Sequence, residues 1–487
     1  MYLEHMESSS WPIILFITEL VLKILMIAVV ILQRKKTSSA KLAWILLIIF
    51  IPLGGSILYM LVGTRRLGSI RRRRHKKIIA QIPQSISSHK NCCTAVKNGE
   101  VKEKFHSIAS IAETVGASFV LGGNNATLFG DSKKWAEALA EDICNAKKHC
   151  HILSYIMLDD KAGTLISDAM VDASARGVQC RLLLDSMGSK DFLHSKTCAR
   201  LRDNNIQVVE ALPANILRAA LVRLDLRNHR KIAVIDNEIG YMGSNNIAEA
   251  SFAPKEKYAP WVDASVRLTG PIVRELHAIF IQDWFMDSDE NLAELLQESL
   301  TIPSEGFSAQ LMATGPNSNN QALSQLLQTA FFSAQHELVI TTPYFCLDDS
   351  TESALLICAK RGIETHLVLP ANNDSQLVAA ASRSSFAKIL EAGVQIHEFH
   401  GGLLHSKTMT IDRELALIGS ANLDRRSLDL NFEINMLVYN TDFASELRFL
   451  QTTYIEESTP VRLHNVRQWS IPRRLWQNAI GLISPIL

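Results

Sequence analysis

Metal-binding cysteine patterns are missing from this sequence. Its 487 residues include eight cysteines, and none of them forms a C-x-x-C or C-x-x-H motif. Cys92 and Cys93 are adjacent, which is a poor geometry for a mutual disulfide. These absences argue against structural zinc, and they fit a reducing compartment. The eight positions are Cys92, Cys93, Cys144, Cys150, Cys180, Cys198, Cys346 and Cys358.

A strong excess of charge is also missing. Lys and Arg number 50 and Asp and Glu number 49, so that the formal net charge is +1. No global field therefore marks the chain as a nucleic-acid binder or as an enzyme for acidic substrates. No strip of interleaved aromatic and basic residues stands out either. We expect no nucleic-acid partner.

The first of two long apolar runs covers residues 11–32. It is long enough to cross a bilayer. Only Glu19 and Lys23 interrupt it, and on a helix these two stand at i and i+4, where they can pair. A signal peptide is the alternative, but this run is long, contains an acidic residue and is followed at once by a second run. The sequence therefore predicts a transmembrane helix over 11–32.

The second apolar run, residues 42–62, contains no charged residue. Pro52 and the adjacent Gly54 and Gly55 predict a kink within it. We interpret it as a second transmembrane helix, so that the two runs form a helical hairpin. A hairpin would place the residues before the first run and the main body on the same side of the membrane.

Basic residues around the two runs indicate the orientation of such a hairpin. The connector carries four of them, but the larger cluster begins the basic membrane-proximal linker, 63–110, on the side of the main body. We therefore expect a cytoplasmic body, although the charged connector argues for the opposite. The larger cluster could also bind anionic lipid head groups. The connector holds Arg34, Lys35, Lys36 and Lys41, and the cluster holds Arg65, Arg66, Arg71, Arg72, Arg73, Arg74, Lys76 and Lys77.

One pattern of histidine, lysine and aspartate occurs twice in the rest of the chain. HRKIAVID ends at Asp236 and HSKTMTID ends at Asp412, and both read H-x-K-x-x-x-x-D. The apolar residues of the first copy are typical of a buried strand. Side chains at i and i+2 share one face of a strand, so that His229 and Lys231 point the same way, as do His405 and Lys407.

Each copy continues, after six further residues, as G-S-x-N. A lone histidine at a strand end is usually structural, but chance does not produce these six fixed positions twice in one chain. The two turns are Gly243-Ser244-Asn245-Asn246 and Gly419-Ser420-Ala421-Asn422.

Segments upstream of the two motifs also match. Tyr155 corresponds to Tyr344, and the Arg-Gly pair at Arg176 corresponds to the pair at Arg361. Each half alternates helices and strands, which predicts one α/β layered unit used twice. We expect two homologous α-β-α layered domains, 111–300 and 301–487, that face each other around a pseudo-twofold axis as one catalytic body.

The residue types in the two motifs suit the chemistry of a phosphodiester. Lys231 and Lys407 can hold the charge of the non-bridging oxygens, and they favour a neutral imidazole nearby. One histidine can then attack phosphorus while the other protonates the departing alkoxide. The turns add hydrogen-bond donors for the phosphate: Ser244 with Asn245 or Asn246, and Ser420 with Asn422.

A histidine pair that binds zinc is the competing interpretation. It leaves Lys231 and Lys407 without a role and lacks further ligands at suitable spacing. We therefore expect no metal and no cofactor.

Carboxylates beyond each motif are candidates for orienting the imidazoles. Asp236 and Asp412 lie at an odd spacing from their histidines and face the other side of the strand, so that we expect both to be structural. Asp263 and Glu433 each begin an alternating segment typical of a strand, and each could accept the proton on the far ring nitrogen. Surface or capping roles for these two carboxylates are the alternative.

With these residues in place, the chain resembles the phospholipase D superfamily with its duplicated HKD motif. Within it, the chain is similar to bacterial cardiolipin synthases that have two N-terminal membrane spans. The resemblance covers nearly the whole length and includes LLLDSMGS, NHRK, TTPYF, GGLLHSK and SLDLNFEIN.

The resemblance implies a reaction in which two phosphatidylglycerols give cardiolipin and glycerol through a phosphatidyl-histidine, without metal or nucleotide. One motif histidine is then the nucleophile, for which we favour His229, and the other is the acid and base. The carboxylates at Asp263 and Glu433 orient them. The same resemblance implies an integral protein of the bacterial inner membrane, and it leaves open a homo-oligomer.

Three other functions remain as alternatives. A phospholipase D-type hydrolase, or a transferase that uses another alcohol, would share the chemistry as far as the phosphohistidine. A membrane-tethered nuclease lacks a recognisable nucleic-acid strip. A lipid-binding scaffold would be expected to have lost a motif histidine or lysine.

Two segments outside the motifs resemble membrane-surface helices. The first half holds an extra piece before His229, in which Ile216, Leu217, Ala220, Leu221 and Leu224 stand at helical spacing among arginines. The tail, with Arg473, Arg474 and Trp476, has the same character. For each segment, packing against the body is the alternative.

Overall fold

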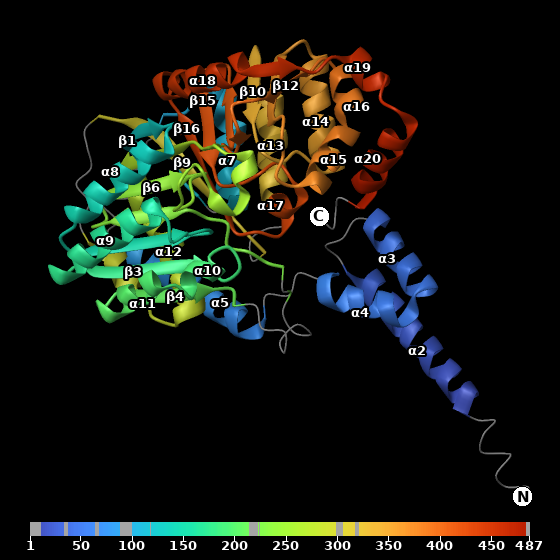
Figure 1. The fold of residues 1–487 in the computed structure, drawn as a ribbon, viewed down its shortest axis with the longest axis horizontal. Helices are drawn as coiled ribbons and strands as arrows, with labels where there is room; N and C mark the ends of the chain where they lie inside the picture. Colours follow the sequence, from blue (N-terminus) through green and yellow to red (C-terminus); the bar gives the residue numbers. More distant parts are fainter. Residues whose placement is uncertain are drawn as a thin grey trace, which may run out of the picture. The chain divides into compact units, whose positions relative to one another are not determined.

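A computed structural model describes residues 11–33, 38–63, 68–87, 100–116, 118–213, 223, 225–298, 305–316 and 321–483. The chain divides into two compact units (Figure 1). The first unit comprises Met1–Ser69 with Ala214–Leu226, and the second comprises Ile70–Pro213 with Arg227–Leu487. The apolar residues of the predicted helix before His229, positions 216–224, lie outside the described residues.

The first unit contains three apolar helices, α2 (Trp11–Leu32), α3 (Ser38–Phe50) and α4 (Pro52–Val62). Of the described helices, α2 alone has the length and composition to cross a membrane. Lys23 pairs with Glu19 at 2.8 Å, as their spacing predicts.

The second apolar run is two helices rather than the single kinked helix that its sequence predicts. Ile51 leaves helical geometry at φ −131° and ψ 75°, because Pro52 disfavours the α region for the residue before it. The helices then fold back on each other: the rings of Trp44 and Tyr59 lie 5.2 Å apart. A Cβ on Gly55 would lie 2.7 Å from the carbonyl oxygen of Leu47, so that only glycine permits this approach.

Neither of these helices is long enough to cross a bilayer alone. Their 13 and 11 residues correspond to roughly 20 and 17 Å of helix, against a hydrocarbon core of about 30 Å. The structure thus describes one helix with the length and composition of a membrane span, followed by a folded-back pair, and the transmembrane hairpin over 11–32 and 42–62 stays a prediction.

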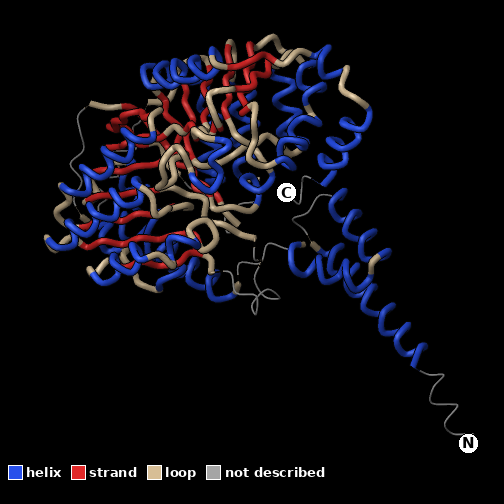
Figure 2. Tube along the Cα trace, viewed as in Figure 1, coloured by secondary structure: helices blue, strands red, loops and turns tan. Residues whose placement is uncertain are grey.

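The second unit is built on one sheet of 15 strands, which the tube in Figure 2 shows in red. Its order is β17-β12-β11-β10-β14-β15-β16-β9-β1-β8-β6-β5-β2-β3-β4. Strands β1 and β9 pair where the two halves meet. From this pair, seven strands of each half run outward in mirrored order, and β17 adds an eighth strand at the edge of the second half. The predicted fold class, two similar α/β layered halves, is confirmed.

Strands and helices alternate in both halves. The first half holds β1 (Leu121–Phe129), α8 (Ser132–Cys144), β2 (His149–Ser154), α9 (Lys161–Ala175), β3 (Gln179–Asp185), α11 (Lys196–Asp203), β4 (Gln207–Ala211), β5 (Ile232–Ile235), β6 (Ile239–Gly243), β7 (Trp261–Val262), β8 (Ser265–Thr269) and α12 (Ile272–Ser288). The second holds β9 (Phe307–Thr314), α13 (Ala322–Ser333), β10 (Glu337–Thr341), α14 (Asp349–Lys360), β11 (Glu364–Pro370), α15 (Gln376–Ser384), α16 (Phe386–Glu391), β12 (Gln395–Phe399), β13 (Leu403–Leu404), β14 (Thr408–Ile411), β15 (Leu415–Gly419), α17 (Arg425–Asp429), β16 (Glu433–Tyr439), α18 (Thr441–Glu456), β17 (Ser458–Pro460), α19 (Leu463–Arg467) and α20 (Ile471–Ile483).

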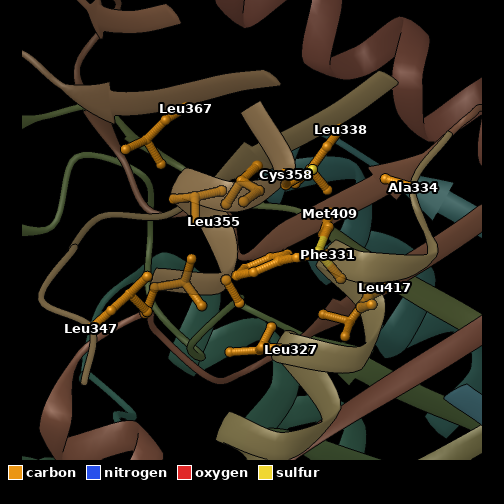
Figure 3. Close-up of a cluster of buried hydrophobic side chains, with 14 of the residues drawn as sticks. Leu327, Phe331, Ala334, Leu338, Leu347, Leu355, Cys358, Leu367, Met409 and Leu417 are labelled. Atoms are coloured by element: carbon orange, nitrogen blue, oxygen red, sulfur yellow. The ribbon is translucent and has the colours of Figure 1, made fainter. Parts of the chain in front are cut away.

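Apolar layers cover both faces of the sheet, which explains why its central strands are continuous apolar runs. In the second half, Phe331 of α13 and Leu355 of α14 pack on Leu367 and Met409 of the sheet (Figure 3). A separate cluster surrounds α8 and α9 in the first half. A third contains residues of both halves, among them Val234 from β5 and Ile418 from β15. The two halves therefore share a core.

Helix α5 (Ser69–Ser87) carries much of the basic cluster, and it packs on the body rather than forming a loose linker. Ile78 and Ile82 are buried in the shared core. Arg71 donates to Asp287, and Arg74 pairs with Asp289 at 3.2 Å. Part of the cluster thus attaches α5 to α12.

Asp236 and Asp412, the aspartates of the two motifs, bind the backbone of a neighbouring strand. Asp236 accepts hydrogen bonds from the amides of residues 147, 148 and 149, at 2.7 to 2.9 Å. Asp412 accepts from the amides of residues 335, 336 and 337, and from Lys104 at 3.1 Å. Both aspartates have a positive φ, 54° and 53°. Each therefore joins the turn after its motif strand to the start of β2 or β10.

We predict that Asp412→Asn lowers the thermal unfolding temperature of the detergent-solubilised protein. Weakening the hydrogen bonds to the charged Asp412 carboxylate should lower the free energy of unfolding by about 1.5–3 kcal/mol. The backbone amides and Lys104 overcome burial and hold the pKa of Asp412 below its ordinary value. Its stabilising effect is therefore present above about pH 4 and is lost as pH falls through the lowered pKa, where variant and parent converge. The exposed Asp172→Asn is the control, and an equal loss there would contradict the assignment.

Candidate active site

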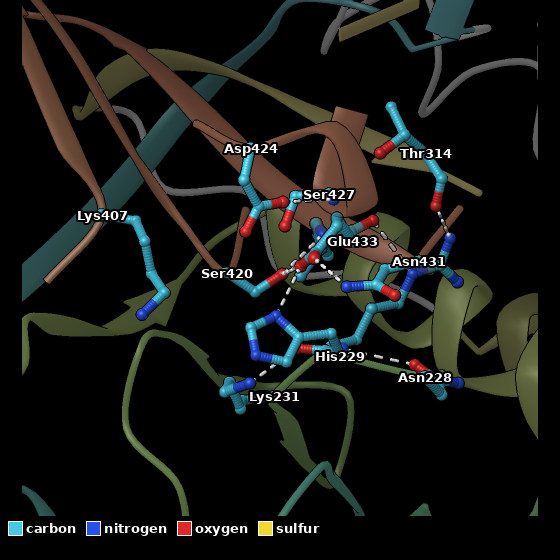
Figure 4. Close-up of polar contacts among 12 residues, drawn as sticks. Asn228, His229, Lys231, Thr314, Lys407, Ser420, Asp424, Ser427, Asn431 and Glu433 are labelled. Carbon is cyan, nitrogen blue, oxygen red and sulfur yellow. Dashed lines mark hydrogen bonds and ion pairs between the residues drawn. The ribbon is translucent and has the colours of Figure 1, made fainter. Parts of the chain in front are cut away.

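The two motif histidines are bonded to carboxylates from opposite halves of the body. Nδ1 of His229 lies 2.9 Å from Oε2 of Glu433, and Nδ1 of His405 lies 2.6 Å from Oδ1 of Asp263. Because a carboxylate accepts, each Nδ1 carries a proton and each Nε2 keeps its lone pair. Figure 4 shows the first of these pairs. The sequence singled out both carboxylates, but it did not show that they cross between halves.

Backbone hydrogen bonds also connect each histidine to the opposite half of the body. The amide of His229 donates to the carbonyl of Phe432 at 2.9 Å, and the amide of His405 donates to that of Val262 at 2.7 Å. Each acceptor directly precedes an orienting carboxylate. Strands β7 and β13 pair beside the second site, and a bridge joins Asn228 to Phe432 beside the first. The two imidazoles are thus fixed by main chain as well as by carboxylate.

Ser244 and Ser420, expected to donate to a phosphate, donate to the orienting carboxylates instead. The Ser244 hydroxyl lies 2.6 Å from Oδ1 of Asp263, and the Ser420 hydroxyl lies 2.5 Å from Oε2 of Glu433. Each hydroxyl also accepts a backbone amide, from Ala264 or Ile434. Their protons are therefore used within the protein, and the serines hold the carboxylates in place.

The asparagines of the two turns differ in what they contact. Asn245 bonds to Ser132 and Ser265, away from the histidines. Asn246 accepts the amide of Ile156 through its oxygen at 3.3 Å. Asn422 is buried, and its side-chain oxygen has no partner among the described residues. Asn246 and Asn422 remain the predicted phosphate contacts.

Lys231 and Lys407 are buried beside the histidines. Each ammonium donates to the backbone carbonyl of its own motif histidine, Lys231 at 2.8 Å. Lys231 also lies 5.2 Å from the centre of the Tyr155 ring. Burial lowers the pKa of Lys231 to about 8 and that of Lys407 to about 7, although the nearby carboxylates oppose the shift. Two cations held in so little solvent leave a strong demand for an anion.

The histidines are neutral at physiological pH. Burial, with a smaller effect from the neighbouring lysines, lowers the pKa of His229 and of His405 to about 4, because the carboxylates only partly compensate. Burial alone would raise the pKa of Asp263 and Glu433, but the imidazoles, lysines and serines outweigh it, so that both pKa values lie below the ordinary range. The site therefore combines neutral imidazoles, charged carboxylates and titratable lysines.

Arg230 is a residue of the site that sequence reasoning missed. It lies between His229 and Lys231, where the second motif has a serine. Its guanidinium pairs with the buried Asp283 at 2.8 Å and donates to the carbonyls of Glu433 and Thr314, at 3.1 and 3.0 Å. The difference between HRK and HSK was the visible signal. Arg230 fastens the strand that carries Glu433 to the first half.

Aromatic rings next to the two histidines break the symmetry. The Tyr155 ring stands 4.9 Å from that of His229, and the Trp261 ring stands 4.6 Å from that of His405. Tyr344, the sequence counterpart of Tyr155, donates its hydroxyl to Asp374 at 2.6 Å. The two imidazoles thus have different neighbours, as expected if they perform different steps.

The described residues contain a buried group of three histidines that could hold a metal ion, His149, His151 and His277. Arg181 lies 3.1 Å from Nε2 of His151, and Nδ1 of His151 lies 2.8 Å from Nε2 of His277, whose Nδ1 faces Asn237. Since the guanidinium can only donate, every proton in this chain is assigned. A metal on these nitrogens would need the proton of His151 removed beside a buried cation, so that we interpret the group as structural.

We predict that the site binds sulfate, an analogue of the phosphodiester anion, more tightly at pH 6 than at pH 9. Both lysine pKa values lie between these limits, and loss of one charge-assisted hydrogen bond weakens binding about tenfold or more. Calorimetry on the detergent-solubilised protein measures this. Lys407→Met and Lys231→Met should each remove part of the pH dependence, and the exposed Lys133→Met should remove none. Binding that is independent of pH would refute the assignment.

Family models match both the body and the apolar segment. A model described as "Cardiolipin synthase, PLD-like domain" matches residues 139–284 and 327–450, which contain the two motifs. A model described as "Phospholipase_D-nuclease N-terminal" matches residues 21–63.

Curated relatives match over nearly the whole chain. Cardiolipin synthase A of Klebsiella pneumoniae is 34% identical over 94% of this chain and 95% of its own length. Cardiolipin synthase A of Salmonella arizonae is 35% identical over 92% of each. Among solved structures, phosphatidylserine synthase of Haemophilus influenzae aligns with a TM-score of 0.59 at 15% identity, over 78% of this chain and 100% of its own, which shows a shared fold. With its two crossed histidine–carboxylate pairs, the chain belongs to the cardiolipin synthase family of the phospholipase D superfamily.

Proposed function

We propose that the enzyme joins two phosphatidylglycerol molecules into cardiolipin and releases glycerol. Its family makes it a phosphatidyltransferase. The observation that supports the proposal most directly is the crossed pair of neutral imidazoles, each with a lone pair on Nε2, beside two buried lysines. This arrangement supplies a nucleophile, an acid and charge for a phosphodiester without further groups.

In the first step, Nε2 of His229 attacks the phosphorus of one phosphatidylglycerol. The bond from phosphorus to the head-group glycerol oxygen breaks, and that oxygen takes a proton from Nε2 of His405. The phosphodiester charge raises the pKa of His405, which allows it to carry this proton. Glu433 stabilises the positive charge that develops on His229, and Lys231 and Lys407 hold the non-bridging oxygens.

In the second step, a head-group hydroxyl of another phosphatidylglycerol attacks the phosphatidyl-histidine. Nε2 of His405, now without its proton, removes the hydroxyl proton, the phosphorus–nitrogen bond breaks, and His229 leaves as a neutral imidazole. The products are cardiolipin and free glycerol, and the site returns to its starting protonation.

We predict equal amounts of cardiolipin and glycerol from purified protein in detergent with phosphatidylglycerol as the only lipid. Mass spectrometry measures the lipid, and an enzymatic assay measures glycerol. His229→Ala and His405→Ala should each lower the rate at least about 10³-fold, because each removes a bond-making or proton-transfer group. Lys133→Met is the matched surface control. Phosphatidic acid as the main product would assign the protein to the hydrolases, and lipid binding without turnover would favour the scaffold.

An activated substrate separates the roles of the two histidines. Phosphatidyl-p-nitrophenol needs no proton on its leaving group, so that His405→Ala should still release p-nitrophenol and accumulate a phosphatidyl adduct on His229. His229→Ala should form neither. The reverse pattern would exchange the two roles.

The enzyme associates with membranes, and we propose a cytoplasmic body behind a single span. If α2 crosses once and α3 and α4 fold back within one leaflet, the connector at 33–37 and the basic cluster at 65–77 lie on the same side. Both then obey the positive-inside rule. A two-span hairpin would place Arg34, Lys35 and Lys36 outside, against that rule.

We predict that a membrane-impermeant maleimide labels Ser8→Cys in intact spheroplasts, and labels Thr37→Cys only after lysis. The unaltered chain gives the background from its native cysteines. A two-span hairpin requires the opposite pattern, with Thr37→Cys labelled from outside and Ser8→Cys protected.

A further inference from the structure

The C-terminal helix α20 packs on the body with a partly polar face and exposes most of its large apolar side chains. It packs on α15, where Ile480 joins Ala380 and Ala381 in a small cluster and Gln477 is also buried. Gln477 and Ile480 stand at i and i+3 and so share one face of the helix. The inward face of α20 is therefore partly polar.

The outward face of α20 is apolar. Ile471, Leu475 and Leu482 are 71%, 65% and 83% exposed, and they fall on the side opposite the packing face. Trp476, 56% exposed, stands at its margin. Core packing, the alternative considered from the sequence, would require these residues to point inward. This outward apolar stripe is what a helix at a bilayer surface presents.

A pocket of about 470 Å³ lies on the inward side of α20, between this helix and α15. Its lining includes Arg383, Arg473, Trp476 and Tyr258, with amide side chains between them. Arg383 forms an ion pair with Glu398 at 3.2 Å. Arg473 stacks on Trp469 at 4.0 Å and has no ion pair among the described residues. Two guanidinium groups with one carboxylate leave the pocket positive.

The pocket lies where β10 and β11 end. Asn373 lines it and donates to the carbonyl of Pro343 at 2.7 Å. The next residue, Asp374, accepts the hydroxyl proton of Tyr344. Burial, with Asp374 and more weakly Tyr155, raises the pKa of Tyr344, and Tyr155 stands against His229. A molecule in the pocket would thus lie at the carboxyl ends of β10 and β11.

We propose that α20 lies in the membrane interface, with its apolar stripe among the acyl chains, and that the adjoining pocket holds the head group of an anionic phospholipid. Charge complementarity and the outward stripe identify a lipid surface as the occupant. In the sequence, only residues 63–68 separate the last apolar helix from α5, so that a bilayer is within reach of the body. This inference rests on membrane association and not on the chemistry at His229 and His405.

Photocrosslinking of the full-length chain tests the first part. Benzoylphenylalanine replaces Leu475, or Phe449 on α18 as a control that is also apolar and 73% exposed. The protein also carries His405→Ala, so that the lipids are not consumed, and it is placed in nanodiscs of phosphatidylcholine with or without phosphatidylglycerol. We expect phospholipid adducts at position 475 and not at 449. Adducts to a second copy would make α20 a homo-oligomer interface, and the absence of lipid adducts would also overturn the proposal.

Two neighbouring arginines test the second part. Arg473 lines the pocket, whereas Arg474 on the same helix does not. Arg473→Gln should lower the preference for phosphatidylglycerol in the adducts about fivefold, and Arg474→Gln should lower it less. Equal losses would show diffuse attraction to a charged surface and would overturn the head-group site. Since all variants are catalytically inactive, a failure here is independent of any failure of the proposed reaction.

Discussion

The catalytic body depends on one interaction repeated twice, the hydrogen bond between an imidazole of one half and a carboxylate of the other. Glu433 and Asp263 are fully enclosed, and removing such a carboxylate from water is costly unless a partner is charged or donates to it. Histidine, serine and lysine together meet that requirement. Each half therefore completes the other, and neither half alone contains a full set of reacting groups with their supports.

Much of this arrangement could be predicted from the sequence because duplication makes patterns visible. The two motifs and their G-S-x-N turns identified both histidines and both lysines, and the alternating segments at Asp263 and Glu433 identified the carboxylates. The crossing could not be predicted, because it depends on which strand ends meet after the halves pack together. Equally, Ser244 and Ser420 look like phosphate donors until their distances to the carboxylates are known.

The apolar segments show a different limit of sequence reasoning. Pro52 signals an interruption, but an interruption is compatible with either a bend in a spanning helix or a reversal. The reversal depends on Gly55, which lets α4 lie directly against the backbone of α3 at Leu47. Composition alone does not show that these two positions are in contact. In α20 the composition was also ambiguous, and the decisive fact is which face Ile480 occupies.

The pairing of β1 with β9 has a mechanical consequence. Asn124 at this junction bonds to Leu121, Phe307 and Ile272, and its side chain is completely enclosed. A hinge between the halves would have to break these bonds and part of a continuous ladder, and it would open the shared core to water. The two halves therefore do not open and close around the active site by a hinge motion. The geometry of the active site is set before substrate arrives, so that the substrate lipids have to adapt to a site of fixed shape.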